Sequence, residues 1–200
     1  MIRVINADFV KSSPSIVEAL SEGVMEAVFL GRSNVGKSSL INALCCKKQL
    51  AKSSSTPGKT RLINFFDIVY EDGEKNRFNA RFVDLPGFGY AKVSKEVKKT
   101  WEETLNTFIK ERVSVRLFIH LIDSRHTNLD IDKSVHEYVN SILRADQKVL
   151  NIYTKADKLT QKECSMILKD KNALLVSVLK KRGIDEANER IFNLLFGKET

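Results

Sequence analysis

The stretch Gly31-Arg32-Ser33-Asn34-Val35-Gly36-Lys37-Ser38-Ser39 decides the fold that we predict for this chain. It follows an apolar run at residues 28–30 and opens into residues 40–44, whose composition predicts a helix. A strand, a loop of pattern G-x-x-x-x-G-K-[ST] and a helix, in this order, are typical of a loop that binds phosphate groups. The glycines let successive N–H groups point at an anion, and the helix N-terminus adds partial positive charge. The alternative is a Gly/Ser turn that binds nothing.

Two side chains of this loop have predicted chemical roles, and a second motif adds to them. Lys37 would reach the β- and γ-phosphates of a nucleotide, and the Ser38 hydroxyl would ligate the Mg²⁺ that neutralises them. The second motif is Asp84-Leu85-Pro86-Gly87, at the end of another apolar strand. Its aspartate can reach the Mg²⁺ shell, usually through water, and its glycine N–H can bond a γ-phosphate. This D-x-x-G pattern is weak alone and strong after a phosphate loop.

Base recognition is predicted for Thr154-Lys155-Ala156-Asp157, which follows the apolar strand of residues 149–153. The Asp157 carboxylate can accept hydrogen bonds from N1 and N2 of guanine, and adenine offers neither arrangement. Each hydrogen bond to a charged group contributes about 1.5–3 kcal/mol, so the site should prefer GTP to ATP. The alternative is a surface loop without a ligand. Backbone N–H groups that could hold the guanine O6 belong to the next strand end, Val176 followed by Ser177-Val178-Leu179-Lys180.

A second protein ligand to Mg²⁺ is predicted in the polar loop before the strand of residues 62–70. Its candidates are Thr56 and Thr60, and we favour Thr60 because it is the last hydroxyl before that strand. Such a loop orders when a γ-phosphate is present. The predicted nucleotide contacts of this loop are Gly58, Lys59, Thr60, Arg61 and Leu62. The predicted catalytic residues are Lys37, Thr60 and Gly87, and the predicted metal ligands are Ser38, Thr60 and Asp84.

Composition limits the class of protein. The 200 residues suit one domain, residues 1–200, with residues 1–22 as an N-terminal extension packed on it. No apolar run approaches the ~20 residues that cross a bilayer, and the N-terminus lacks a signal-peptide core, so we expect a cytoplasmic protein. The three cysteines lack metal-ligand spacing and suit reduced thiols. The net charge of +8 attracts polyanions, RNA foremost, with ordinary solubility as the alternative.

Strands and helices alternate over most of the chain. Apolar or alternating runs predict strands at residues 62–70, 78–84, 115–123, 149–153 and 173–176, and a leading strand or an arm at residues 2–10. Asp72-Gly73 lies in a short polar loop between two of them, which indicates an antiparallel hairpin. We therefore predict an α/β protein with three layers. Its central sheet is mostly parallel with one antiparallel edge strand, and helices cover both faces.

Helices are predicted from apolar residues at helical spacing. A short one is expected over residues 14–20, with Ser13 as N-cap and Pro14 at its first position. Others are expected near residues 161–168 and 184–195. Two stripes are interpreted as helix faces that pack into the core: Val97, Trp101, Leu105, Phe108 and Ile109, and then Ile131, Val135, Tyr138, Val139 and Ile142.

With these motifs taken together, the chain resembles the EngB (YihA/YsxC) family of ribosome-biogenesis GTPases, within the TrmE-Era-EngA-EngB-Septin-like P-loop GTPase superfamily. The phosphate loop and the Thr154–Asp157 segment match many GTPases. Two other stretches are similar to EngB specifically: Thr56-Pro57-Gly58-Lys59-Thr60 with Asn64-Phe65-Phe66, and Asp84-Leu85-Pro86-Gly87-Phe88-Gly89-Tyr90-Ala91. The resemblance covers nearly the whole chain. It implies the three-layer P-loop NTPase fold of small G proteins and the binding of GTP and Mg²⁺. It also implies association with the large ribosomal subunit during assembly, and a link to cell division and septation.

Three departures from related GTPases bear on the expected mechanism. Phe88 stands where many switch GTPases have a glutamine that orients water, so intrinsic hydrolysis should be slow and partner-dependent. Asn34 occupies a position that helps some relatives hold K⁺, with a loop-stabilising amide as the alternative. Thr154 replaces the usual asparagine of the guanine motif and keeps one donated hydrogen bond. Arg32 and Arg61 could donate to phosphate in cis, but we interpret both as solvated or RNA-facing charges.

The sequence therefore predicts a monomeric GTP-dependent switch, with a GTP-sensing RNA- or protein-binding module as one alternative and an ATP-dependent P-loop enzyme as another. No catalytic role is assigned to the histidines. His120 lies in a buried strand and is interpreted as a core residue whose polar atoms are satisfied. His126 and His136 have no metal-ligand partner at suitable spacing.

Overall fold

The computed structural model describes residues 2–52, 62–88, 99, 103 and 106–197. Its centre is a seven-stranded sheet in the order β1-β3-β4-β2-β5-β6-β7. The strands are β1 Arg3–Ser13, β2 Met25–Gly31, β3 Ile63–Glu71, β4 Arg77–Asp84, β5 Val115–Asp123, β6 Lys148–Thr154 and β7 Ala173–Leu175. The helices are α1 Lys37–Leu44, α3 Asp130–Ile142, α4 Gln161–Ile167 and α5 Ile184–Phe196, with a 3₁₀ turn at Ala156–Lys158.

Five neighbouring strands, β4, β2, β5, β6 and β7, run parallel to one another. The strand β3 is antiparallel to β4 and also to β1. The predicted α/β class and the hairpin of β3 and β4 are therefore confirmed. The antiparallel strand, however, is second from the edge, because the N-terminal strand β1 pairs along its outer side with nine Cα partners from Arg3↔Glu71 to Ser13↔Ile63.

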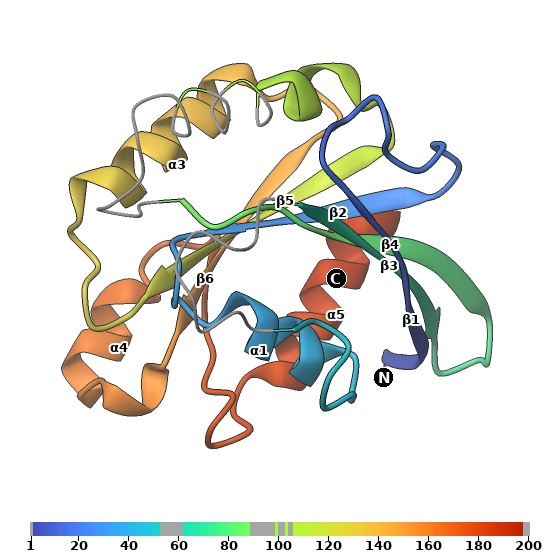
Figure 1. Ribbon diagram of the computed structural model, residues 1–200. Coiled ribbons are helices and arrows are strands. Elements are labelled where there is room, and N and C mark those ends of the chain that lie inside the picture. The colour runs from blue at the N-terminus through green and yellow to red at the C-terminus, as the bar shows by residue number, and fades with distance from the viewer. Residues whose placement is uncertain (1, 53–61, 89–98, 100–102, 104–105, 198–200) are drawn as a thin grey trace.

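Helices cover both faces of the sheet, as predicted (Figure 1). On one face, α1 and α5 pack over the core that contains Phe29, Phe82 and Ile152. On the other face, α3 and the helical residues 106–111 pack over Val28, Leu30 and Phe118. Alternate residues of a strand point to opposite faces, so β2 supplies Val28 and Leu30 to one core and Phe29 to the other.

Residues 14–20 do not form the predicted helix and contain bends and a turn instead. Ser13 explains the error. It is the last residue of β1, and its hydroxyl donates to the carbonyl of Ser15 at 3.0 Å rather than accepting from a helical N–H. Ser13 is therefore not an N-cap, because it is paired in β1 and no helix follows it. Ile16 and Leu20 of this segment are partly buried against the α3-side core.

The predicted core stripes are confirmed in part. Val139 is buried and Val135 and Ile142 are partly buried against the core, whereas Ile131 is 36% exposed. The neighbouring residue Asp132, rather than Ile131, is the one that is buried, with 3% of its surface exposed. In the other stripe Phe108 and Ile109 are fully buried, while Val97, Trp101 and Leu105 lie outside the described residues. Among those described residues, no helix is both long and apolar enough to span a membrane.

Candidate functional site

The predicted phosphate loop lies between the end of β2 and the start of α1. Its backbone is unusual, because Asn34 has φ 63° and Gly36, the N-cap of α1, has φ 104°. A left-handed φ costs little for glycine and about 1 kcal/mol or more for most other residues, which explains a glycine at position 36. Gly31 is needed for another reason, since an added Cβ would lie 2.9 Å from Cγ1 of Val35 and 3.2 Å from the carbonyl oxygen of Leu121.

The N-terminus of α1 has no side-chain cap. The first N–H groups of a helix lack intrahelical acceptors, so the N–H groups at this end can point at an external anion. Two other N–H groups of the loop are used internally: Ser33 donates to Phe88 O at 3.1 Å, and Val35 donates to Arg32 O at 3.2 Å. The loop therefore holds its own shape and keeps the helix end available for phosphate.

Lys37 is the first residue of α1 and its side chain is almost completely buried. Its Nζ pairs with the carboxylate of Asp84 and donates to the carbonyl of Leu85 at 2.7 Å. Burial lowers the pKa of Lys37 to about 7, so the ammonium depends on an anionic partner to remain charged. Asp84, the last residue of β4, is that partner here, and a polyphosphate could take its place.

The segment after Asp84 contacts the phosphate loop directly. A Cβ added to Gly87 would lie 3.0 Å from the Ser33 hydroxyl oxygen and 3.2 Å from the Ser33 nitrogen, so only glycine fits without movement. Phe88 donates its N–H to Gly31 O at 3.2 Å. Leu85 and Pro86 are buried, and the structure thus brings the two predicted phosphate-side motifs together.

The loop that contains Gly58, Lys59, Thr60 and Arg61, together with the rival Thr56, lies outside the described residues. The proposed roles of these residues stay predictions. Leu62 is described and lies just before β3, where it is 39% exposed. Ser38 and Ser39 belong to the first turn of α1, with Ser38 half-buried and Ser39 exposed.

The segment Thr154–Asp157 is tied to the phosphate loop by two side chains. The Thr154 hydroxyl donates to Val35 O at 2.7 Å, and Lys155 Nζ donates to Asn34 O at 2.9 Å. A hydroxyl has one proton, so Thr154 makes one strong donated bond here, as the sequence predicted. The base-side and phosphate-side segments, about 120 residues apart in the chain, therefore form one continuous surface.

Asp157 and the segment after β7 lie side by side. The Ser177 hydroxyl donates to Asp157 Oδ1 at 2.6 Å, and Ala156 N donates to Val176 O at 3.1 Å. The hydrogen bond from Ser177 lowers the pKa of Asp157, so this carboxylate is ionised at neutral pH. Ser177 and Val176 are fully buried, and Val178 packs against the core on the α1 side.

Arg32 has a partner that the sequence did not suggest. Its Nε donates at 3.1 Å to Asp132 Oδ2, in the first turn of α3, and the Arg32 side chain is 24% exposed. The interpretation of Arg32 as a solvated or RNA-facing charge is therefore wrong. A carboxylate as buried as Asp132 requires a nearby cation, and Arg32 supplies it. The stripe of apolar residues in α3 could not reveal this pair, because it indicates which apolar residues face the core and says nothing about the partner of a charged residue such as Asp132 that lies between them.

We expect Arg32→Met to lower the free energy of unfolding by about 2 kcal/mol, because it leaves the buried Asp132 carboxylate unpaired, with the partial exposure of Arg32 reducing the effect. Asp132→Asn should cost less, since a neutral amide needs no cation. Urea unfolding of each variant and of the double variant measures this. A double variant less stable than Arg32→Met would contradict it.

His120 is buried, as predicted, but its ring nitrogens are not satisfied. Within the described part of the chain neither nitrogen has a hydrogen-bond partner. Its ring stacks on His136 with centroids 6.1 Å apart, and the Phe88 ring lies 6.2 Å away on a centroid basis. Burial, with a further contribution from His136, lowers the pKa of His120 to about 4, so the ring is neutral at physiological pH. His126 is exposed.

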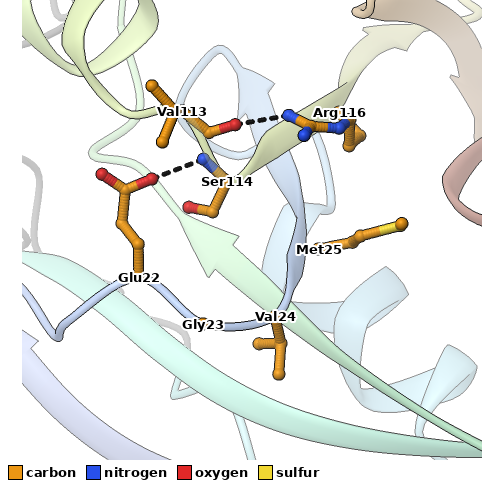
Figure 2. Close-up of a pocket in the computed structure, with 7 residues that line it drawn as sticks. All are labelled: Glu22, Gly23, Val24, Met25, Val113, Ser114 and Arg116. Carbon is orange, nitrogen blue, oxygen red and sulfur yellow. Dashed lines mark hydrogen bonds between the residues drawn. The ribbon is translucent and has the colours of Figure 1, made fainter.

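A surface pocket lies at the opposite end of the sheet, where β2 and β5 begin (Figure 2). Glu22 accepts from the N–H of Ser114 there, and Arg116 donates to the carbonyl of Val113. Ligands of parallel sheets bind at the carboxyl ends of the strands, so this pocket is not the nucleotide site. Its lining is Glu22, Gly23, Val24, Met25, Val113, Ser114 and Arg116.

Comparison with known proteins agrees with the geometry. Residues 26–155 match the family model described as 50S ribosome-binding GTPase. The chain is 57% identical over 189 residues to the probable GTP-binding protein EngB of Campylobacter lari, which covers 94% of each chain. It is 45% identical over 200 residues to that of Wolinella succinogenes, which covers the whole of both. This chain belongs to the EngB family of GTPases.

Solved structures support the fold of this EngB family member. A crystal structure of a probable GTP-binding protein EngB has a TM-score of 0.66 at 23% identity and covers 86% of this chain and all of that one. Era, solved with MgGDPNP and a segment of 16S ribosomal RNA, has a TM-score of 0.64 at 22% identity, over 90% of this chain and 59% of that one. As in the family, the chain binds guanine nucleotide and is a GTPase.

Proposed function

We propose that this GTPase is a slow molecular switch that acts on the large ribosomal subunit during its assembly. The observation that carries the proposal is the link between the two halves of the site. Thr154 and Lys155 bond carbonyls of Val35 and Asn34, so one nucleotide can span from the α1 N-terminus to Asp157. A ligand held at both ends ties loops from distant parts of the chain into one state, which is what a switch requires.

The residues present fit Mg²⁺ with a polyphosphate. Ser38 and Asp84 supply a hydroxyl and a carboxylate at neighbouring strand and helix ends, and hard oxygen ligands of this kind suit Mg²⁺. When bound, Mg²⁺ would neutralise charge on the β- and γ-phosphates. Lys37 would exchange Asp84 for phosphate, which frees the carboxylate for the metal shell. We propose Thr60 as a further ligand and Gly87 N–H as a γ-phosphate donor.

Slow intrinsic turnover follows from Phe88. Its ring is 5% exposed and lies near His120 and its neighbour His136 on the α3 side of the sheet. A buried phenyl ring cannot orient an attacking water by hydrogen bonding. A partner or an ion must supply the missing stabilisation, and a supplied charge can raise the rate about 10³–10⁵-fold. K⁺ held near Asn34, whose side chain is exposed, is one source.

The ribosomal partner is supported by the family description, by the basic net charge of +8, and by the fold shared with Era, whose structure contains ribosomal RNA. We infer that the protein is a cytoplasmic monomer with one GTP-binding domain. The single domain is supported by β1, which joins the same sheet as the nucleotide segments. We also propose that the protein is needed for normal cell division and septation, as the family resemblance implies.

Calorimetry with GDP, GTP and ATP, followed by sedimentation of the loaded protein with ribosomal subunits, tests the proposal. We expect micromolar or tighter binding of GDP and GTP, at least 100-fold weaker binding of ATP, and cosedimentation with the large subunit in the GTP form only. Rapid GTP hydrolysis by the protein alone, independent of K⁺, would show that the switch is not partner-dependent. Equal cosedimentation of the GDP and GTP forms would show that binding to the large subunit does not depend on the nucleotide, which contradicts the proposed switch.

The buried Phe88 also favours a second candidate, a GTP sensor in which turnover is incidental. The two functions differ in what hydrolysis does. A sensor should act normally with a non-hydrolysable GTP analogue, whereas a switch should remain trapped on its ribosomal particle with that analogue. The rate at which the protein is released from purified large subunits after a chase distinguishes the sensor from the switch.

A further inference from the structure

Asp123 is the last residue of β5, and its carboxylate accepts four hydrogen bonds, three from Arg125 and one from Lys155. Arg125 donates through Nε at 2.9 Å and Nη2 at 2.7 Å, and its backbone N–H donates at 3.1 Å. Lys155 Nζ donates at 2.8 Å to Oδ2. The Asp123 side chain is 6% exposed, against 31% for Lys155 and 45% for Arg125. A buried anion thus lies beneath two partly exposed cations at the edge where the nucleotide segments meet.

Lys155 is fixed at both ends of its side chain. Its backbone is left-handed at φ 59°, where the segment leaves β6, and its ammonium bonds both Asp123 and Asn34 O of the phosphate loop. A free lysine side chain samples many rotamers, and that freedom must be lost if the side chain is to hold one position. Two acceptors at the tip, Asn34 O and Asp123 Oδ2, hold it between the base-side and phosphate-side segments before any ligand arrives.

We propose that Asp123 is a positioning residue for nucleotide binding, which holds the Lys155 stem as a platform under the purine ring, and that Arg125 holds Asp123. The inference rests on the proposed site, in which phosphates lie at the α1 N-terminus and the base edge meets Asp157. Between those two points the surface contains the methylene stem of Lys155, because its tip reaches Asn34. An apolar stem held in place suits the face of a base, whatever groups its edge has.

A purely structural role for the Asp123 side chain does not account for the arrangement. The ends of β5 and β6 are already joined by backbone, since Ser124 N donates to Thr154 O at 3.0 Å and the strands pair in register to Asp123↔Thr154. Burial raises the pKa of Asp123, but hydrogen bonds from Arg125 and Lys155 outweigh it and hold that pKa well below its usual range. The carboxylate is therefore a permanent anion that holds the lysine tip.

The test is a double-mutant cycle on nucleotide affinity. Dissociation constants for GDP and IDP, which lacks the 2-amino group, are measured for wild type, Asp123→Asn, Lys155→Met and the double variant. We expect Asp123→Asn to weaken GDP and IDP binding by the same factor, about tenfold, with the GDP:IDP ratio unchanged. In the Lys155→Met background the substitution should have no further effect, because interacting residues do not contribute additively. Independent, additive losses would overturn the proposal.

Two further variants keep the test decisive. Arg125→Met, at a half-exposed position, should weaken both nucleotides about threefold and have no effect in the Lys155→Met background. Arg116→Met removes a more exposed ion pair, Arg116–Asp146, at the other end of β5, and should leave affinity unchanged. If Asp123→Asn lowers the unfolding midpoint of the nucleotide-free protein while both affinities stay as in wild type, the role is structural and the inference fails. If wild type itself does not bind GDP, the proposed function fails instead.

Discussion

Asp157→Asn is expected to weaken GTP binding about 100-fold or more and to create binding of xanthosine triphosphate. The carboxylate accepts from N1–H and from the 2-amino group of guanine, and each hydrogen bond to a charged group is worth about 1.5–3 kcal/mol. Xanthine has an oxygen in place of the 2-amino group, so an asparagine NH₂ can donate to it. Calorimetry with GTP, XTP and ATP measures the change in preference.

The geometry around Asp157 makes this substitution selective for the base. Ser177 Oγ fixes Oδ1 at 2.6 Å, and the amide oxygen of an asparagine can accept the same bond. The fold should therefore be retained. Asp185→Asn, on the exposed first turn of α5, is the matched control and should leave all three affinities unchanged. Wild-type GTP affinity in Asp157→Asn would mean that this aspartate does not contact the base.

Arg112→Met should destabilise the protein by about 3–5 kcal/mol, the range found when one partner of a buried ion pair is removed. Arg112 donates to both carboxylate oxygens of Glu26, at 2.5 and 2.7 Å, and the two side chains are 4% and 0% exposed. Its guanidinium also lies 5.3 Å from the Phe65 ring centroid and 5.5 Å from that of Phe108. The substitution leaves a carboxylate buried in the sheet with Arg81, 3.5 Å away, as its remaining cation.

Equilibrium unfolding in urea at neutral pH, without nucleotide, measures this effect. The double variant Glu26→Gln with Arg112→Met should recover part of the loss, because it removes the buried charge that Arg112 no longer neutralises and that Arg81 at 3.5 Å compensates only in part. Arg116→Met is again the control: its pair with Asp146 is exposed to 33% and 47%, and pairs of that kind contribute about 0–1 kcal/mol. An Arg112→Met protein as stable as the Arg116→Met protein would show that the buried pair does not stabilise this fold.

The architecture could be predicted where a local sequence pattern corresponds directly to the burial of an element in the fold. Near-continuous apolar runs became β5 and β6 because a central parallel strand is buried on both faces. The helix predicted over residues 14–20 is wrong. Ser13, the expected N-cap, pairs instead with Ile63 at the end of β1, so pairing with a strand replaces capping of a local helix. Local propensity is a weak guide where a distant strand provides the alternative bonds.

In the site, residues whose spacing along the chain sets their geometry were predictable. The order of Gly31, Gly36 and Lys37 determines a turn and a helix start, so a motif identifies them. Asp123 was not predicted as a site residue. Like Asp84, it ends an apolar strand at the same edge of the sheet, and this position in the sequence was the feature that could have indicated it. Asp132 had no such signal, because its partner Arg32 lies 100 residues away.

By itself the sequence determined the fold class, the phosphate loop, the candidate base-reading aspartate and the family. These depend on short-range stereochemistry and on apolar periodicity, which are properties of neighbouring residues. Only the tertiary structure decided which charges are paired: Arg32 with Asp132, Arg112 with Glu26, and Lys155 with Asp123. The physical reason is that a charge pair depends on distance in space and on burial, and the packing of α3 and the sheet sets both.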